Sequence, residues 1–326
     1  MTQLPKEIDT NTENSGHVQL LTVSHEEAGQ RLDNWLLRHL HGVPKTRVYK
    51  AIRKGEVRVN KGRAKAELRL EGGDRVRLPP LRQAAARAPA MASSHWADRI
   101  RNAIVLDDGD LIVINKPTGL AVHGGSGVSA GLIETLRLIY PERKYLELVH
   151  RLDRDTSGLL LIAGRASVLR ELHAQLRNGG IDKRYQALVA GRWAAHVSHV
   201  DAPLEKYALA SGERLVKVAA GGRKARTEYR VLQRWHAATL IEAKPITGRT
   251  HQIRVHCRHA GHPILGDAKY SSDVADKLAT SLDLNRLFLH AAGLRFTLGG
   301  EQLHLQAPLD AELQGACDAL NKLQGS

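Results

Sequence analysis

The sequence contains few of the residues from which disulfide-linked or membrane-spanning proteins are built. Its two cysteines, Cys257 and Cys317, are too few for a disulfide framework. The polar residues 1–16 lack the apolar core of a signal peptide. The longest apolar runs, such as residues 158–163, have the length of a buried strand and are much shorter than a membrane span. These absences exclude a secreted disulfide scaffold and an integral membrane protein, and we expect a soluble protein in the cytoplasm.

Acidic residues are scarce relative to basic ones. The chain has 48 Lys and Arg against 34 Asp and Glu, a formal net charge of +14 at pH 7. This balance favours a polyanionic partner, with nucleic acid ahead of an anionic membrane surface. The 326 residues suffice for a large domain and a small one. We expect a flexible tail at residues 1–16, a small domain at 17–80, a linker at 81–96 and a large domain at 97–326.

The small domain is predicted to begin with two short helices. Apolar residues recur at one-turn spacing in the first helix, at Leu32, Leu36 and Leu40. The second helix is predicted to begin at the N-cap Thr46 and to end at Gly55. Strands are expected at residues 57–59 and 76–78, with a turn at residues 60–62. The expected order is therefore helix, helix and a small sheet.

The large domain is rich in short apolar segments bounded by turn residues, which predict strands. They lie at residues 103–106, 111–115, 145–149, 159–163, 185–190, 239–243 and 287–290. Helices are expected at residues 131–139 and 167–176. Because strands and helices do not alternate regularly, we predict an α+β fold with a mixed, mainly antiparallel sheet.

The small domain carries much of the excess positive charge. Residues 45–77 contain twelve basic and four acidic side chains. Arg47, Lys50 and Lys54 share one face of the second predicted helix, from which they could contact successive RNA phosphates. The alternative is a solvated helix whose charges serve solubility. Residues 31–36, 57–62 and 73–79 resemble the S-four module, a small RNA-binding fold in which the second helix and the following loop face the RNA.

An unusually charged segment lies between the predicted strands at 145–149 and 159–163. Residues 150–158 read His-Arg-Leu-Asp-Arg-Asp-Thr-Ser-Gly. Arginines close to an aspartate stabilise its ionised form and keep it available as a nucleophile. The alternative is a structural turn in which Asp155, Thr156 or Ser157 caps backbone amides and the arginines form surface ion pairs.

This segment resembles the signature of the pseudouridine synthases that act on large-subunit ribosomal RNA. Matching residue by residue, the resemblance implies that Asp153 is the catalytic nucleophile and that Arg151 displaces the target base. Asp155 falls on a variable position of the motif and is assigned no catalytic role. The resemblance also implies a central cleft in the large domain.

Three further segments match this family in the same order. Residues 115–123 resemble the motif upstream of the nucleophile, and residues 183–185 match a Lys-x-Tyr motif that places Tyr185 against the target base. Residues 245–256 match a motif whose arginine, Arg254, pairs with the catalytic aspartate. Arg249 and His251 are expected nearby, as substrate-binding residues. Residues 266–267 and 287–291 complete the resemblance as framework.

The implied activity is the isomerisation of specific uridines to pseudouridine in large-subunit ribosomal RNA. Residues 123–127 and 146–158 resemble one bacterial subfamily of these enzymes. The reaction involves no redox change and no group transfer, so no cofactor is implied. Attack by the aspartate on the ribose and attack on the ring both stay open, and no residue pattern identifies the uridines modified. Neither a membrane nor a protein partner is predicted.

Two other function classes share part of this pattern. A non-enzymatic RNA-binding protein would have the same basic small domain. A metal-dependent hydrolase is suggested by a cluster of candidate ligands in one segment: His251, His256, Cys257, His259 and His262. That segment predicts a helix that begins at the cap Thr250, on which the adjacent His256 and Cys257 diverge. No recognised zinc spacing is present, so no metal site is predicted. Residues 124–127 lack a following Gly-Lys-Ser/Thr, which disfavours nucleotide hydrolysis.

Overall fold

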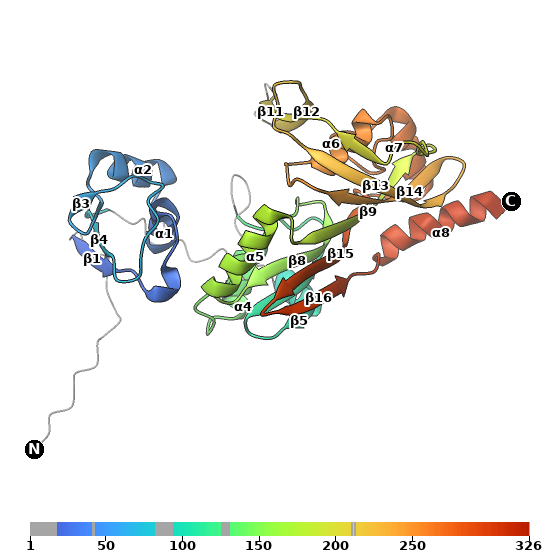
Figure 1. Cartoon of the computed structure of the whole chain (residues 1–326). Helices are drawn as coiled ribbons and strands as arrows, with labels where there is room; N and C mark the ends of the chain where they lie inside the picture. Colours follow the sequence, from blue (N-terminus) through green and yellow to red (C-terminus); the bar gives the residue numbers. More distant parts are fainter. Residues whose placement is uncertain are drawn as a thin grey trace, which may run out of the picture. The chain divides into compact units, whose positions relative to one another are not determined.

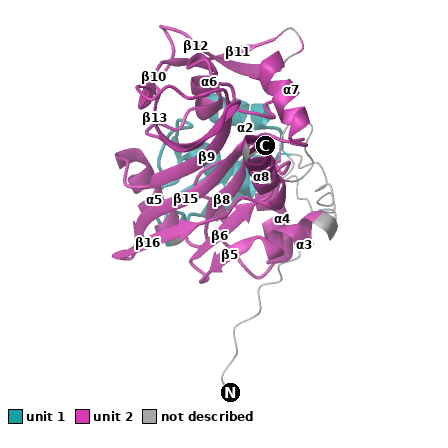
Figure 2. Cartoon of the chain, turned by 90° about the vertical axis from the view of Figure 1, so that its right-hand side faces the viewer, with its two compact units in different colours: residues 1–91 teal, residues 92–326 magenta. Residues whose placement is uncertain are grey.

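The computed structural model describes residues 18–40, 43–81, 94–124, 131–209, 211 and 213–325. The chain forms two compact units, residues 1–91 and residues 92–326, which Figure 2 colours separately. Each unit has a hydrophobic core of its own, as expected of a domain. The predicted tail at residues 1–16 lies outside the described residues, as do residues 82–93 of the predicted linker.

The described part of the smaller unit contains two α-helices, a 3-10 helix and a four-stranded antiparallel sheet in the order β1-β4-β2-β3. Its elements are β1 (Gln19–Thr22), the 3-10 helix η1 (His25–Glu27), α1 (Leu32–His39), α2 (Lys45–Lys54), β2 (Arg58–Val59), β3 (Gly62–Arg63) and β4 (Arg75–Leu78). The core packs Trp35 and Leu36 of α1 with Val48 and Ile52 of α2 against Val76 of β4. The two predicted helices and the small sheet are present, but the predicted order was wrong at its start. β1 precedes α1 because it pairs with β4, the last strand of this sheet.

Of the two caps predicted for α2, the C-terminal one is confirmed and the N-terminal one is wrong. Gly55 adopts the left-handed conformation with φ 70° and closes the helix, as its position predicted. The N-cap is Pro44, without a side-chain cap bond, so the prediction for Thr46 was wrong. The Pro44 carbonyl oxygen accepts hydrogen bonds from the Arg47 and Val48 amides, which starts the helix before Thr46.

The larger unit is built on one extended sheet with the strand order β10-β13-β14-β9-β15-β8-β6-β5 (Figure 1). The strands are β5 (Ile104–Asp107), β6 (Leu111–Lys116), β7 (Glu147–Leu148), β8 (Ser157–Ala163), β9 (Asp182–Ala190), β10 (His199–Asp201), β11 (Leu204–Ala208), β12 (Arg214–Val218), β13 (Arg226–Arg234), β14 (Ala238–Pro245), β15 (Leu289–Leu298) and β16 (Glu301–Gln306). β16 pairs with β15, β7 pairs with β8, and β11 and β12 form a separate hairpin. Among the described strands only β8 and β15 pair in parallel, which confirms the mixed, mainly antiparallel sheet.

Helices cover this sheet in two halves of the unit. They are α3 (Ser94–Asn102), α4 (Leu132–Ile139), α5 (Ala166–Asn178), α6 (Gln252–His259), α7 (Asp273–Ser281) and α8 (Ala311–Gly325). Figure 1 shows α4 and α5 in one half and α6 and α7 in the other, joined where β9 pairs with β15. In the described residues no helix is long and apolar enough to cross a bilayer. The segment predicted as a strand at 145–149 forms only the two-residue β7.

The strand β8, which precedes α5, is apolar along most of its length because both of its faces are buried. All seven residues of β8 are buried. Leu160 and Ile162 point to a core shared with α4, whereas Leu159 and Leu161 point to a core shared with α5. Burial on both faces removes the polar alternation of a half-exposed strand. It also fixes the start of β8, where the charged segment joins the sheet.

Candidate active site

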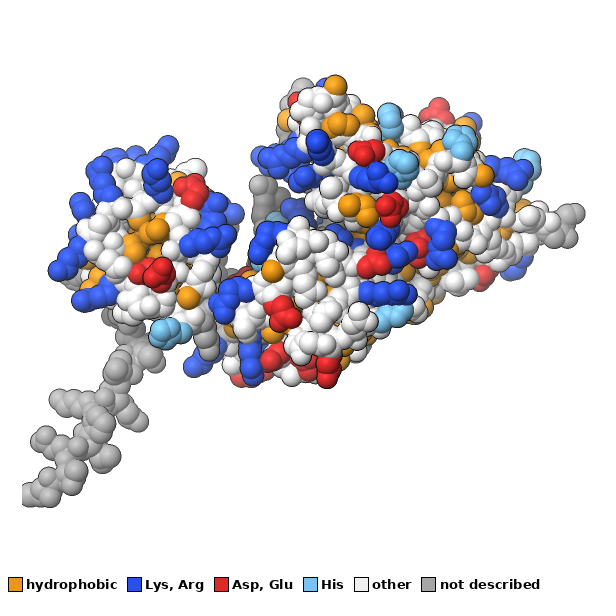
Figure 3. Space-filling view, viewed as in Figure 1, with side chains coloured by type: hydrophobic (Ala, Val, Ile, Leu, Met, Phe, Trp, Pro, Cys, Tyr) orange, Lys and Arg blue, Asp and Glu red, His pale blue; other side chains and the backbone are white. Residues whose placement is uncertain are grey.

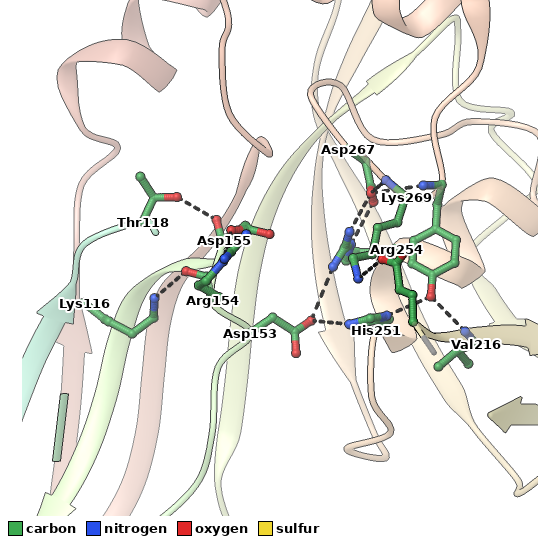
Figure 4. A network of polar contacts seen from close by, with 12 residues as sticks. Lys116, Thr118, Asp153, Arg154, Asp155, Val216, His251, Arg254, Asp267 and Lys269 are labelled. Atoms are coloured by element: carbon green, nitrogen blue, oxygen red, sulfur yellow. Dashed lines mark hydrogen bonds and ion pairs between the residues drawn. The ribbon is translucent and has the colours of Figure 1, made fainter. Parts of the chain in front are cut away.

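The loop between β7 and β8 carries Asp153, and its backbone is tethered on the C-terminal side of that residue. The buried Lys116 ammonium group donates to three carbonyl oxygens, including that of Arg154 at 3.1 Å. The Thr118 hydroxyl donates to the carbonyl oxygen of Asp155 at 2.9 Å. Burial lowers the pKa of Lys116 to about 7, although its three acceptors match the three N–H bonds of a charged ammonium group. Figure 4 shows both tethers beside Asp153.

A cleft of about 660 Å³ opens beside this loop. Its walls come from the loop itself, from the C-terminal part of α5, from the start of β9 and from the segment that leads into α6. The basic side chains that line it are His150, Arg151, His173, Arg177, Lys183, Arg249, His251 and Arg254. Among the described residues of the lining, Asp153 is the sole acidic side chain. The cleft therefore presents one carboxylate within a basic surface.

Asp153 lies near two basic groups without forming a tight ion pair. Its Oδ2 atom is 3.8 Å from Arg254 Nη1 and 3.8 Å from His251 Nε2, and its side chain is 21% exposed. Figure 4 shows Arg254, on α6, and His251, just before α6, approaching the carboxylate from the other half of the unit. The carboxylate is thus held in a positive field while remaining accessible from the cleft.

Arg254 has a closer partner in Asp267. Its Nε donates to Asp267 Oδ2 at 2.8 Å and its Nη2 donates to Asp267 Oδ1 at 2.6 Å. The Asp267 carboxylate also accepts the backbone amides of Lys269 and Tyr270, and its side chain is fully buried. The Tyr270 ring packs against the Arg254 guanidinium group, 5.1 Å from its centroid. This bidentate pair fixes the guanidinium group beside Asp153.

The second neighbour of Asp153, His251, is oriented by the Tyr270 hydroxyl. His251 precedes α6 in the left-handed conformation, with φ 52°, which is uncommon for a residue other than glycine. Its Nδ1 lies 2.7 Å from the Tyr270 oxygen, which accepts the Val216 amide at 2.9 Å. The Tyr270 O–H is therefore available to donate to Nδ1, and this favours the tautomer with its proton on Nε2, facing Asp153. Burial lowers the pKa of His251, while the charge of Asp153 opposes that shift.

Tyr185 lines the same cleft from β9. Burial raises the pKa of its hydroxyl, and the charge of Asp153 adds to the shift. The hydroxyl is therefore protonated at neutral pH and able to donate a hydrogen bond. Within the described part of the chain it has no hydrogen-bond partner, so the group is available to a ligand.

Comparison with known proteins identifies the family of this chain. Residues 110–259 match the family model described as RNA pseudouridylate synthase, and residues 30–76 match the S4 domain. The chain is 50% identical over 312 residues to ribosomal large subunit pseudouridine synthase C of Pasteurella multocida, with 95% of this chain and 96% of the relative covered. The chain belongs to the RNA pseudouridylate synthase family. Members of this family are isomerases, so the enzyme class predicted from the sequence is confirmed.

Other relatives of this pseudouridine synthase agree. The protein of the same name from Escherichia coli K12 is 50% identical over 315 residues, which cover 95% of this chain and 98% of the relative. These names confirm the subfamily resemblance carried by residues 123–127 and 146–158, of which residues 125–127 lie outside the described part. The solved structure of human RNA pseudouridylate synthase domain containing 4 is similar with a TM-score of 0.59 and 27% identity, covering 70% of this chain and 96% of that chain.

The structure brings six of the nine predicted site residues together around the cleft. They are Arg151, Asp153, Tyr185, Arg249, His251 and Arg254. Arg151 and Arg249 are exposed at the cleft, and Arg249 Nε donates to the Lys224 carbonyl oxygen at 3.1 Å. The other three predicted residues belong to the smaller unit. Of these, Arg47 forms an ion pair with Glu56 at 2.8 Å.

The two remaining basic residues of α2 lie on its exposed surface. Lys50 and Lys54 are both exposed. Figure 3 shows Lys and Arg side chains around much of the visible rim of this unit. The charge expected at residues 45–77 is therefore presented to solvent, where it can meet a polyanion.

Several residues that shape the site were not predicted to do so. Asp267 was expected only as framework, yet it is the bidentate partner of Arg254. Tyr270 links the hairpin residue Val216 to His251. Asp267 follows Gly266, which has φ 70° and leaves no room for a side chain beside the Arg286 backbone. The Gly-Asp pair in the sequence could therefore have indicated the tight turn that positions Asp267. Nothing in the local sequence marks Tyr270.

The cysteine and histidines considered as metal ligands point to different partners. His256 contacts Thr227 and the Ala202 carbonyl oxygen, and Cys257 is buried against Tyr229. His262 contacts the Ala190 carbonyl oxygen through Nδ1. Within the described ranges, no three His, Cys, Asp or Glu side chains are grouped so that they could hold a metal ion.

The N-terminus of α6 also differs from its prediction. The N-cap is His251 and makes no side-chain cap bond, so the cap predicted at Thr250 was wrong. Gln252 organises this turn instead, because its Oε1 atom accepts the Arg249 amide and the Thr247 hydroxyl. The helix nevertheless ends just before Gly261, as predicted.

A second pair of potentially reactive groups is sealed inside the protein. Ser157 Oγ lies 2.8 Å from His290 Nδ1, and both residues are at most 2% exposed. His290 Nε2 contacts the Ala307 carbonyl oxygen, and Arg286 donates to Ser157 Oγ. This network is closed to substrate, so its serine fixes the start of β8 and does not act as a nucleophile.

Proposed function

We propose that this pseudouridine synthase isomerises selected uridines of large-subunit ribosomal RNA, with Asp153 as its nucleophile. The observation that carries the proposal is the carboxylate of Asp153, in a cleft whose other described lining residues are basic or neutral. The names of the relatives at 50–51% identity support the class of RNA. Ribosomal RNA as substrate also favours a cytoplasmic location.

The reaction breaks the bond between ribose C1′ and uracil N1 and forms a bond between C1′ and uracil C5. A proton leaves C5 and a proton is gained at N1, so the reaction is balanced without an oxidant, a reductant or a cofactor. A nucleophile that attacks either the ribose or the ring must be ionised and free of a tight ion pair. Because Arg254 makes its short contacts with Asp267, the 3.8 Å separation leaves Asp153 free of a tight ion pair.

Access to the reacting atoms requires the uridine to leave its stack. Flipping a nucleotide costs on the order of a few kcal/mol, which contacts with the flipped base and the RNA backbone must offset. We assign Arg151 as the side chain that displaces the base, because it is exposed at the cleft beside Asp153. The Tyr185 ring would pack against the uracil, and its free hydroxyl could assist proton transfer. Arg249 and His251 would contact the nucleotide from the opposite wall.

The smaller unit would bind the surrounding RNA. Its match to the S4 domain supports an RNA-binding role. We assign Lys50 and Lys54 of α2 to phosphate contacts because both are exposed on one helix face. Arg47 forms an ion pair with Glu56 and would contact a phosphate after leaving that partner.

The test uses unmodified ribosomal RNA transcribed in vitro. Incubation of large-subunit RNA with the purified chain, followed by pseudouridine mapping, should show modification at a small number of positions. Small-subunit RNA serves as the matched substrate control and should remain unmodified. Binding of large-subunit RNA without any pseudouridine formed would favour the non-enzymatic alternative. Mapping ribosomal RNA from cells with and without the gene then identifies the natural positions.

A further inference from the structure

The cleft contains a half-buried lysine, Lys183, whose charge is balanced by no acidic side chain among the described residues. Lys183 is the second residue of β9 and lines the cleft two residues before Tyr185. In the part of the chain that the structure describes, its side chain has no hydrogen bond and no ion pair. Burial lowers its pKa. Partial burial of an unpaired ammonium group is unfavourable, so a structural reason for this lysine is missing.

The neighbouring residue on the strand provides a direct comparison. Arg184 points to the opposite face of β9, away from the cleft. Its guanidinium group donates to Asp182 at 2.8 Å and to Glu242 at 2.8 Å. Arg254 is likewise paired with Asp267. Among the described residues, Arg184 and Arg254 are therefore each paired with a carboxylate, whereas Lys183 is not.

Two arginines that line the cleft also lack an ion pair among the described residues. Arg177 lies in the last turn of α5, and Arg151 lies in the loop beside Asp153. Both are exposed and both line the cleft. A basic residue in the last turn of a helix also favours the helix dipole, so Arg177 is explained in part without a ligand. Lys183 has no such explanation, and it carries the inference.

We propose that Lys183, assisted by Arg177, forms a subsite for a backbone phosphate of the RNA strand next to the flipped uridine. The inference rests on the proposed function, because phosphates are the anionic groups that an RNA strand brings into the cleft. Lysine suits a phosphate that arrives as a point charge on a flexible strand. The nearby His150 and His173 each use Nε2 in a backbone contact, with the Leu161 amide and the Val149 carbonyl oxygen respectively.

The test compares Lys183→Met with Lys183→Arg in the full chain. Lys183→Met should raise KM for in vitro transcribed large-subunit RNA by about tenfold and leave kcat within about twofold. The slope of log affinity against log salt concentration should become shallower by about 0.7, as expected for one lost contact to a single strand. Lys183→Arg should restore most of the affinity, because it restores the charge. Lys277→Met, on the exposed surface of α7, is the matched control and should change none of these quantities.

Thermal stability separates a binding role from a structural one. Because Lys183→Met removes an unpaired and partly buried charge, the melting temperature without RNA should rise by about 2 °C or more. A lower melting temperature with unchanged KM and salt slope would overturn the inference and make the lysine structural. A reduced kcat with unchanged affinity would overturn it as well. If the wild-type chain formed no pseudouridine, the proposed function would fail, while the binding measurements would still decide the subsite.

Discussion

Replacing Asp267 with asparagine removes one buried negative charge and preserves the shape of the side chain. In the native protein this carboxylate accepts two hydrogen bonds from Arg254, at 2.6 and 2.8 Å. It also accepts the amides of Lys269 and Tyr270. Asparagine can keep the contacts of one oxygen, but its amide nitrogen would face the Arg254 Nε–H. Two donors would then meet where a charged hydrogen bond had been.

The magnitude follows from the burial of the pair. The side chains of Arg254 and Asp267 are 3% and 0% exposed, so solvent screens the lost charge little. Removing one partner of such a pair typically costs about 3–5 kcal/mol. Since Asp153 lies 3.8 Å from Arg254 and can approach it, we expect the lower end, about 3 kcal/mol. That approach would neutralise the nucleophile, and kcat should fall about a hundredfold, equivalent to about 2.7 kcal/mol.

The assay combines thermal unfolding with single-turnover pseudouridine formation at a temperature where the variant is folded. The matched control is Asp107→Asn. Asp107 is the last residue of β5, away from the cleft, and it pairs with Arg143. The side chains of that pair are 23% and 21% exposed, against 3% and 0% for Arg254 and Asp267, so the control should lose less stability and keep its kcat. An Asp267→Asn variant with native kcat would refute the view that Asp267 keeps Arg254 apart from Asp153.

Three further predictions concern other parts of the account. Tyr270→Phe keeps the ring beside Arg254 but loses the hydroxyl that orients His251, so kcat should fall about tenfold with unchanged RNA binding; equal kcat for variant and wild type would contradict that role. Deletion of residues 1–91 should raise KM for large-subunit RNA at least about tenfold without lowering the melting temperature of the larger unit, and unchanged affinity at physiological salt would count against RNA binding by the smaller unit. Burial, together with the charges of Lys183 and His173, lowers the pKa of His150 from 6.5 to about 4. As the pH falls, His150 is protonated in the unfolded chain before it is protonated in the folded one. The free energy of unfolding should therefore fall by about 3 kcal/mol between pH about 6.5 and about 4. Unfolding curves measured at each pH should show that His150→Gln loses much of this acid sensitivity.

The features predictable from the sequence were those encoded by local patterns. The apolar run at residues 159–163 predicted a buried strand, and all of β8 is buried because helices pack on both of its faces. Gly55 closed α2 as expected, because glycine adopts the left-handed conformation without strain. The charged segment around Asp153 was expected in a loop between strands, and it does lie between β7 and β8.

The features that escaped prediction depend on contacts between distant segments. Thr46 and Thr250 are reasonable caps by residue type, but Pro44 and the Gln252 side chain organise those turns in the folded chain. The partner of Arg254 is set by the turn that places Asp267 beneath α6, whereas the family resemblance indicated only the more distant Asp153. An unpaired lysine cannot be recognised in a sequence, because the positions of all nearby carboxylates must be known first.

The most direct test of the account is the rate of pseudouridine formation by Asp153→Asn compared with Asp155→Asn. Asp155 lies two residues along the same loop, where its carboxylate pairs with Arg154 at 3.1 Å, so it controls for any disturbance of the loop. Both variants should bind unmodified large-subunit RNA with native affinity. We expect no detectable pseudouridine from Asp153→Asn and near-native formation from Asp155→Asn. Normal turnover by Asp153→Asn would contradict the assignment of the nucleophile.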